Sequence, residues 1–259
     1  MTDLRVGSMV VEDTGGGAPI VMIHGLGGTS NSFQTLITAL GGYRVLRPDL
    51  PGAGRSSLRP GVPGIGGMAS AVKDCLQAAG IDRAHFVGHS MGTLICQHIA
   101  AGNPEAVASL TLFGPIAEPP VAARAALKER ANAARTSGMT DIAEAISRAT
   151  ISEKTQTGDP VVATFVRESL MRQDPVGYAT HCEALSEAVA ADHGAIRCST
   201  LLVAGASDPV APVDMARQLR DRIAGARLEI VPDTGHWIMV EAPRRSADLL
   251  REHLDGVTW

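Results

Sequence analysis

Three separate segments of the sequence carry side chains whose combination could perform nucleophilic catalysis. Gly88-His89-Ser90-Met91-Gly92 fits the pattern G-x-S-x-G, which is typical of a serine nucleophile on a sharp strand-to-helix turn. A serine hydroxyl is a weak nucleophile at neutral pH and needs a base to take its proton. The imidazole of His236 suits that task, and the carboxylate of Asp208 could orient the ring and stabilise its protonated form.

The residues around these side chains predict that each one follows a strand of the same parallel sheet. The apolar run Ala84–Val87 predicts a buried strand before Ser90, and a helix-compatible run follows the turn. Further strands are predicted at Thr200–Ala204, before Asp208, and at Arg227–Val231, before His236. Because the carboxyl ends of parallel strands line one edge of a sheet, we expect the three side chains to meet there.

Such a site also needs two backbone N–H groups that bind the oxygen on which negative charge develops, an oxyanion hole. One donor is expected from the residue after the nucleophile, here Met91. The other is expected from the glycine-rich loop His24–Gly28, which follows the apolar run Pro19–Ile23. Within that loop we assign the second donor to the N–H of Leu26.

Each of these residues also has a purely structural interpretation. Asp208 could cap the helix that follows it, and His236 could be a packed loop histidine. We expect His24 to hold its own loop by hydrogen bonds, and His89 to pack at the turn rather than act as a second base. The joint order of the signals along the chain favours a serine hydrolase site.

The order of the predicted elements indicates an α/β fold. Strands and helices alternate in two stretches, which predicts right-handed βαβ units and a mainly parallel sheet. Between these stretches we expect helices only, and Asp159-Pro160 and Asp174-Pro175 each look like an N-cap followed by proline. The chain is therefore predicted to consist of a core, residues 1–114 and 196–259, with an inserted helical cap of four short helices, residues 115–195.

Two segments between the early elements are predicted to be loops. Asp49 and Arg55 are expected to pin the loop that follows the strand Tyr43–Arg47. Residues Arg59–Gly67 contain two prolines and four glycines, which predicts an irregular surface loop before a helix over Met68–Ala79.

Composition excludes several classes of protein. The formal charge of −4 and the lack of any Lys/Arg cluster argue against a nucleic-acid partner. No apolar run is long enough to cross a bilayer, and residues 1–7 lack the apolar region of a signal peptide, so we expect no membrane partner and a cytoplasmic location. His181-Cys182, His193 and Cys198 match no zinc spacing, so neither a metal nor a cofactor is expected. The oligomeric state is not indicated.

Taken together, the motifs resemble those of the α/β-hydrolase fold family over nearly the whole chain. They are His24–Gly28, Asp49–Ser56, Gly88–Gly92, Gly205–Pro209 and Gly235–Trp237. The resemblance implies the α/β-hydrolase fold with a helical cap. It also implies Ser90 as nucleophile, His236 as base and Asp208 as the orienting acid, with the amides of Leu26 and Met91 as oxyanion donors.

Within that family the chain is similar to the branch of 3-oxoadipate enol-lactonases and bacterial esterases, through Asp174–Ala179 at the end of the cap. This similarity implies hydrolysis of a small carboxylic ester or lactone. By analogy with an acidic enol-lactone, Arg167 or Arg172 of the cap is expected to bind a substrate carboxylate, and Trp237 is expected to contact the substrate.

Three other activities stay open at this point. Gly235-His236-Trp237 also resembles enzymes that hydrolyse C–C bonds of ring-cleavage products, although their turn usually carries asparagine where His89 stands. A perhydrolase would use peroxide in place of water at the same site. A ligand receptor that kept the hydrolase pocket is the alternative that is not an enzyme.

Overall fold

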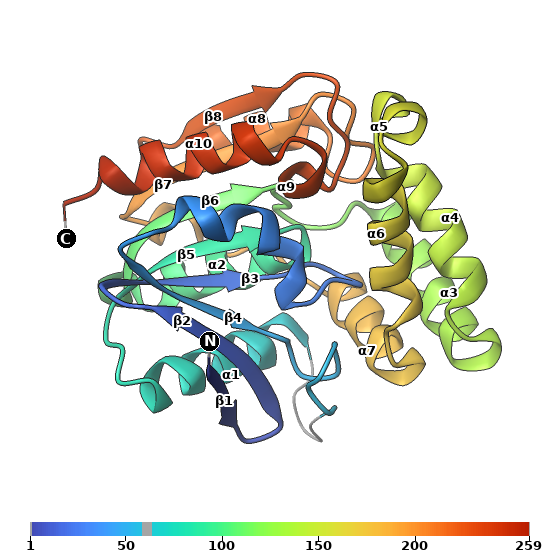
Figure 1. Ribbon diagram of the computed structural model, residues 1–259, viewed down its shortest axis with the longest axis horizontal. Helices are drawn as coiled ribbons and strands as arrows, with labels where there is room; N and C mark the ends of the chain where they lie inside the picture. The colour runs from blue at the N-terminus through green and yellow to red at the C-terminus, as the bar shows by residue number, and fades with distance from the viewer. Residues whose placement is uncertain (1, 59–63, 259) are drawn as a thin grey trace.

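The computed structural model describes residues 2–58 and 64–258, and these form one eight-stranded sheet covered by helices (Figure 1). The strand order is β1-β2-β4-β3-β5-β6-β7-β8; β2 is antiparallel to β1 and β4, and the other neighbours are parallel. The strands are β1 (Thr2–Val6), β2 (Met9–Gly15), β3 (Ala18–Ile23), β4 (Tyr43–Pro48), β5 (Ala84–His89), β6 (Val107–Phe113), β7 (Ser199–Gly205) and β8 (Arg227–Val231).

Helices connect most of the parallel strands. In chain order they are the 3-10 helix η1 (Ser30–Ala39), α1 (Gly64–Ala78), α2 (Met91–Gly102), the 3-10 helix η2 (Pro104–Ala106), α3 (Val121–Ser137), α4 (Thr140–Thr150), α5 (Glu153–Gly158), α6 (Pro160–Met171), α7 (Pro175–Ser186), the 3-10 helix η3 (His193–Ala195), α8 (Val213–Arg222), α9 (Ile238–Glu241) and α10 (Pro243–Asp255).

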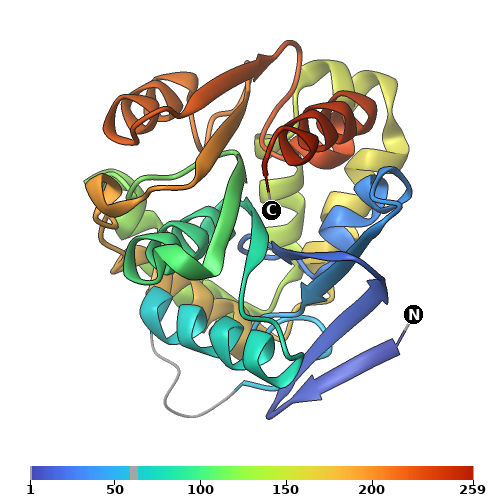
Figure 2. The ribbon, with the colours of Figure 1, turned by 90° about the vertical axis from the view of Figure 1, so that its left-hand side faces the viewer.

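The sheet is buried on both faces, which explains the continuous apolar runs in the sequence. Every residue of β5 and β6 is buried. Helices α1, α2 and α8 lie on one face of the sheet, and η1, α9 and α10 lie on the other (Figure 2). Their buried apolar side chains form the core on each face. The α/β-hydrolase fold predicted from the sequence is confirmed in this mainly parallel, doubly covered sheet.

Helices α3 to α7 follow one another between β6 and β7 and lie together beyond one end of the sheet (Figure 1). The sequence predicts four helices in this stretch, but the described residues form five. The additional helix, Glu153–Gly158, is short and polar, so it has no apolar periodicity to reveal it. Its first turn is fixed instead by the Ser152 side chain, which accepts a hydrogen bond from the N–H of Thr155.

Three other elements differ from the sequence-based expectation. Helix α1 begins at Gly64, because Ile65 and Met68 both bury their side chains against the core. The expected loop therefore ends earlier than Gly67, and its residues 59–63 lie outside the described part of the chain. The edge strand Thr2–Val6 and the short helix Ile238–Glu241 were not anticipated.

Candidate active site

The turn between β5 and α2 holds Ser90 in an unusual backbone conformation. Its φ is 53° and its ψ is −120°, and its N–H donates to the carbonyl of Phe113 on the neighbouring strand over 3.0 Å. Such a conformation is strained for a residue with a side chain, and it persists only because the surrounding packing and hydrogen bonds hold it in place. The serine thereby projects from the strand end at the N-terminus of α2.

The glycines on either side of Ser90 are required by space. A Cβ on Gly92 would lie 2.0 Å from the carbonyl oxygen of Ile23, and one on Gly88 would lie 2.8 Å from the carbonyl oxygen of Gly92. Both distances are shorter than any normal contact. A side chain at either position would therefore obstruct the tight turn.

Asp208 and His236 form a buried hydrogen-bonded pair at the ends of β7 and β8. Nδ1 of His236 and Oδ2 of Asp208 are 2.8 Å apart, and both side chains are almost completely buried. Oδ1 of Asp208 accepts hydrogen bonds from the N–H groups of Val210 and Ala211 in the turn before α8. Helix α8 itself begins after Pro212 without a side-chain cap, so the pairing role is found and the capping of the helix is not.

Burial alone would raise the pKa of the Asp208 carboxyl. The opposing effects are the adjacent His236 ring and the two N–H groups, and together they hold the pKa of Asp208 below its usual value. Asp208 is therefore a carboxylate at neutral pH, with one oxygen directed at the imidazole.

The backbone of His236 is held from two sides. Its N–H donates to the carbonyl of Thr150 at the end of α4 over 2.7 Å. Its carbonyl is 2.9 Å from Nε2 of His89, and since a carbonyl only accepts, Nε2 of His89 carries the proton. Burial lowers the pKa of His89 to about 3, so this ring is neutral and unsuited to act as a second base.

Glu241 fixes the loop that carries His236, a role that no local sequence pattern indicates. Its carboxylate accepts hydrogen bonds from the N–H groups of Gly235 and Trp237, at 3.0 and 3.1 Å. It also accepts from the N–H of Ser152 and the hydroxyl of Thr155. One side chain therefore joins the His236 loop to the junction between α4 and α5.

The loop after β3 lies directly against the serine. A Cβ on Gly25 would be only 2.7 Å from Cβ of Ser90, and Leu26 lines the same cavity as Ser90. Nε2 of His24 accepts from the N–H of Leu50, so its Nδ1 donates to the carbonyl of Gly25 over 2.8 Å. His24 thus holds its loop, as expected.

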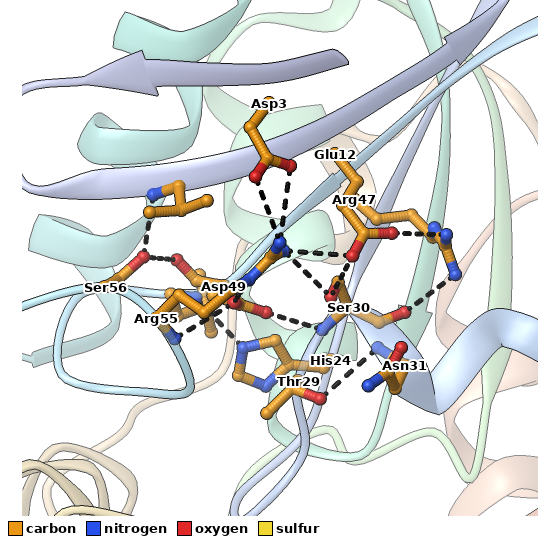
Figure 3. Close-up of polar contacts among 12 residues, drawn as sticks. Asp3, Glu12, His24, Thr29, Ser30, Asn31, Arg47, Asp49, Arg55 and Ser56 are labelled. Carbon is orange, nitrogen blue, oxygen red and sulfur yellow. Dashed lines mark hydrogen bonds and ion pairs between the residues drawn. The ribbon is translucent and has the colours of Figure 1, made fainter. Parts of the chain in front are cut away.

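A cluster of ion pairs fixes the neighbouring loop after β4 (Figure 3). Asp49 accepts from the N–H of Ser30 and from both the backbone and the side chain of Arg55. The Arg55 guanidinium also pairs with Glu12, which in turn pairs with the buried Arg47. The expectation that Asp49 and Arg55 pin this loop is confirmed.

Ser90 and His236 both line a cavity of about 550 Å³ beneath helices α3, α4 and α7, which we call the Ser90 cavity. Trp237 lines it as well, and its indole N–H donates to the hydroxyl of Thr150. Most of the other lining residues are alanine, proline, leucine or isoleucine. The cavity is therefore largely apolar, with the polar side chains of Ser90 and His236 in its lining.

The two arginines predicted to bind a substrate carboxylate lie elsewhere. Arg167 pairs with Glu144 of α4, and Arg172 is mostly exposed and pairs with Glu168 over 2.6 Å. Neither lines the Ser90 cavity; Arg172 lines a larger groove between α6 and the loop after β3. The arginine that does line the Ser90 cavity is Arg130, on α3.

The cysteines and remaining histidines do not gather into a site. Nε2 of His181 contacts the carbonyl of Pro51, and Nε2 of His193 contacts the side chain of Gln97. Within residues 2–58 and 64–258 there is no cluster of three His, Cys, Asp or Glu side chains suited to a metal ion. None of the helices in that part of the chain is both long and apolar enough to span a membrane.

Comparison with known proteins agrees with this architecture. The model of the α/β hydrolase fold family matches residues 18–243, so the chain belongs to that family. The chain is 27% identical to 3-oxoadipate enol-lactonase 1 of Acinetobacter baylyi over 87% of its own length and 84% of the relative's. It is also 27% identical to the 2-hydroxy-6-oxononadienedioate/2-hydroxy-6-oxononatrienedioate hydrolase of a Pseudomonas species, over 91% of this chain and 87% of that one.

Two solved structures are similar over almost the whole chain. A thermophilic esterase from Thermogutta terrifontis superposes with a TM-score of 0.92 and 25% identity, covering 98% of both chains. The enol-lactonase from Burkholderia xenovorans LB400 superposes with a TM-score of 0.90 and 26% identity, covering 98% of this chain and all of the other. The family and these relatives support a hydrolase.

Proposed function

We propose that this chain is a serine hydrolase that cleaves a small carboxylic ester or lactone through an acyl-enzyme. In this proposal Ser90 is the nucleophile, His236 the general base and Asp208 the acid that orients it. The observation that carries the proposal is the Asp208–His236 hydrogen bond of 2.8 Å beside a cavity that also holds the strained Ser90.

The reaction follows from this arrangement. Because Nδ1 of His236 donates to the Asp208 carboxylate, Nε2 is free to take the proton from the Ser90 hydroxyl as its oxygen attacks the carbonyl carbon. The amides of Met91 and Leu26 are the proposed donors to the resulting oxyanion. When the tetrahedral intermediate collapses, the C–O bond to the leaving oxygen breaks, and His236 gives its proton to that oxygen, which departs as the alcohol.

The second half of the reaction repeats these steps with water. His236 takes a proton from water, the hydroxide attacks the acyl carbon, and Ser90 leaves with the proton returned by His236. A lactone differs only in that its alcohol stays attached to the acyl group. We further propose that residues 115–195 act as the cap that selects the substrate, since α3, α4 and α7 supply much of the cavity wall.

C–C bond hydrolysis is the second candidate function. The similarity to the 2-hydroxy-6-oxononadienedioate/2-hydroxy-6-oxononatrienedioate hydrolase favours it, because that relative matches along 91% of this chain. A dienedioate substrate of that type is the probe for it. Faster turnover of the dienedioate than of any ester or lactone would favour the second candidate.

The direct test uses a fluorophosphonate probe together with a panel of 4-nitrophenyl esters and lactones. The probe should label Ser90, and Ser90→Ala should lower kcat by at least ~10³-fold while the protein stays folded. Ser207→Ala, at an exposed serine near the end of β7, is the matched control and should keep full activity. Labelling of another residue, or an active Ser90→Ala protein, would contradict the proposal. A single slow turnover would instead favour the alternative that the chain is a ligand receptor with a hydrolase pocket.

A further inference from the structure

Arg130 is the only Asp, Glu, Lys or Arg residue among the described residues that line the Ser90 cavity. It lies on α3 and is half-buried, and the apolar residues Ala123, Ala126 and Leu127 of the same helix line the cavity with it. A guanidinium stays charged at any physiological pH and presents five donors. The cavity above Ser90 therefore has one cationic wall in otherwise apolar surroundings.

The other arginines of α3 have carboxylate partners. Arg124 pairs with Glu118 at 3.4 Å and donates to two backbone carbonyls, and Arg135 pairs with Glu183 at 2.5 Å. For Arg130, by contrast, no carboxylate lies within ion-pair distance in residues 2–58 and 64–258. Arg130 is thus the arginine of this helix whose charge is left available to a ligand.

The neighbour of Arg130 is the buried side chain of Tyr178 on α7. Burial raises the pKa of the Tyr178 hydroxyl above its usual range, and polar contact with the Arg130 guanidinium opposes that rise. A Cβ on Gly27 would lie 3.4 Å from the Tyr178 ring, so this ring packs beside the loop that carries Leu26. Tyr178 therefore anchors the guanidinium on the side of the cavity nearest that loop, and it is neutral, so it cannot balance the charge.

We propose that Arg130 binds a carboxylate of the substrate, so that the preferred substrates are anionic esters or lactones, such as monoesters of dicarboxylic acids. This inference rests on the proposed function and names its substrate class. A planar guanidinium matches a carboxylate with two parallel hydrogen bonds, and desolvation by the apolar walls strengthens the pair.

The kinetic test compares two esters of similar length, mono-4-nitrophenyl adipate and neutral 4-nitrophenyl heptanoate. Arg130→Gln should lower kcat/KM for the adipate ester by ~10–100-fold and change that for the heptanoate ester by less than about threefold. Arg130→Lys, which keeps the charge but loses the planar fork, should retain part of the preference. Arg135→Gln, on the same helix but outside the cavity, is the matched control and should leave both rates unchanged.

A binding measurement separates this inference from the hydrolase proposal. Adipate should raise the melting temperature of Ser90→Ala, because a ligand that binds only the folded state stabilises it by mass action. The same concentration should have no effect on the double variant Ser90→Ala/Arg130→Gln. The change in melting temperature requires no turnover. It therefore tests the role of Arg130 even if the ester assays fail and the hydrolase proposal is rejected. Equal loss on both esters, or an unchanged adipate effect in the double variant, would overturn the role of Arg130.

Discussion

His89, the residue before Ser90, donates a hydrogen bond from Nε2 to the backbone carbonyl of His236 over 2.9 Å. The turn that carries the serine is thereby tied directly to the loop that carries the histidine, 147 positions further along the chain. Nδ1 of His89 is buried and has no hydrogen-bond partner among the described residues. The ring therefore serves this one bond, which makes it a positioning residue.

Replacing His89 should disturb the placement of His236 more than the binding of substrate. We expect His89→Leu to lower kcat by about tenfold with KM changed less than about twofold, because misplacing a base slows proton transfer, whereas leucine still fills the part of the cavity wall that His89 lines. His89→Gln can still donate and should lose less. Steady-state kinetics on one neutral ester check this, and a rise in KM with unchanged kcat would contradict it.

Gly114 and Gly138 offer a matched pair of substitutions. Both have positive φ, 57° and 79°, so alanine at either position costs backbone strain on the order of 1–3 kcal/mol. A Cβ on Gly114 would also lie 3.1 Å from the His236 ring, whereas one on Gly138 would meet nothing within 4 Å. Both variants should melt at lower temperature, but only Gly114→Ala should lose kcat. Equal kcat in the two variants would show that His236 is not displaced.

Buried histidines should make the protein sensitive to acid. Burial lowers the pKa of His85, His181 and His253 to about 4 each, and that of His89 to about 3. The unfolded chain binds protons at these rings once the pH falls below the ordinary value of 6.5, whereas the folded chain does not. The stability that these neutral buried rings contribute to the folded state is therefore fully present above pH 6.5. It is lost as the pH falls from 6.5 toward about 4.

The expected slope is at most about 1.4 kcal/mol of unfolding free energy per pH unit for each histidine. Urea unfolding at pH 7.5, 6.5, 5.5 and 5.0 measures it. His253→Gln replaces a ring that is hydrogen-bonded to the hydroxyls of Thr111 and Ser199. In this variant the free energy of unfolding should fall less steeply with decreasing pH than in wild type. A midpoint that stays constant from pH 7.5 to 5.0 would contradict the assignment.

The strands and the positions at their ends could be predicted because each signal is local. The apolar runs before Ser90 and Asp208 are visible in the sequence, since both faces of the sheet are covered there. The strand before His236, Arg227–Val231, lies at the edge of the sheet and is mostly exposed or half-buried. Parallel packing then places the three residues at one edge without further information. The Asp208–His236 contact required only that the strands align.

The walls of the cavity could not be predicted in the same way. Arg124, Arg130 and Arg135 look alike along the Ala-rich helix α3. Arg135 meets its carboxylate partner, Glu183, only because α7 packs against α3, and the same packing places no carboxylate of α7 within ion-pair distance of Arg130. Glu241 was missed for a similar reason, since its partners Ser152 and Thr155 are more than 80 positions away. Contacts of this kind depend on how the inserted helices dock, and no local pattern encodes it.

The hydrogen bond from the N–H of His236 to the carbonyl of Thr150 bears on how such a chain can diversify. Thr150 belongs to the inserted helices, so replacing the insertion wholesale would also remove a support of the histidine. Exchange of this segment between homologues would therefore affect catalysis as well as specificity, even where every residue outside the segment is kept. A new specificity would arise more readily from substitutions within α3 than from exchange of the whole helical segment. The reason is that the C-terminus of α4 must still present a carbonyl to the N–H of His236.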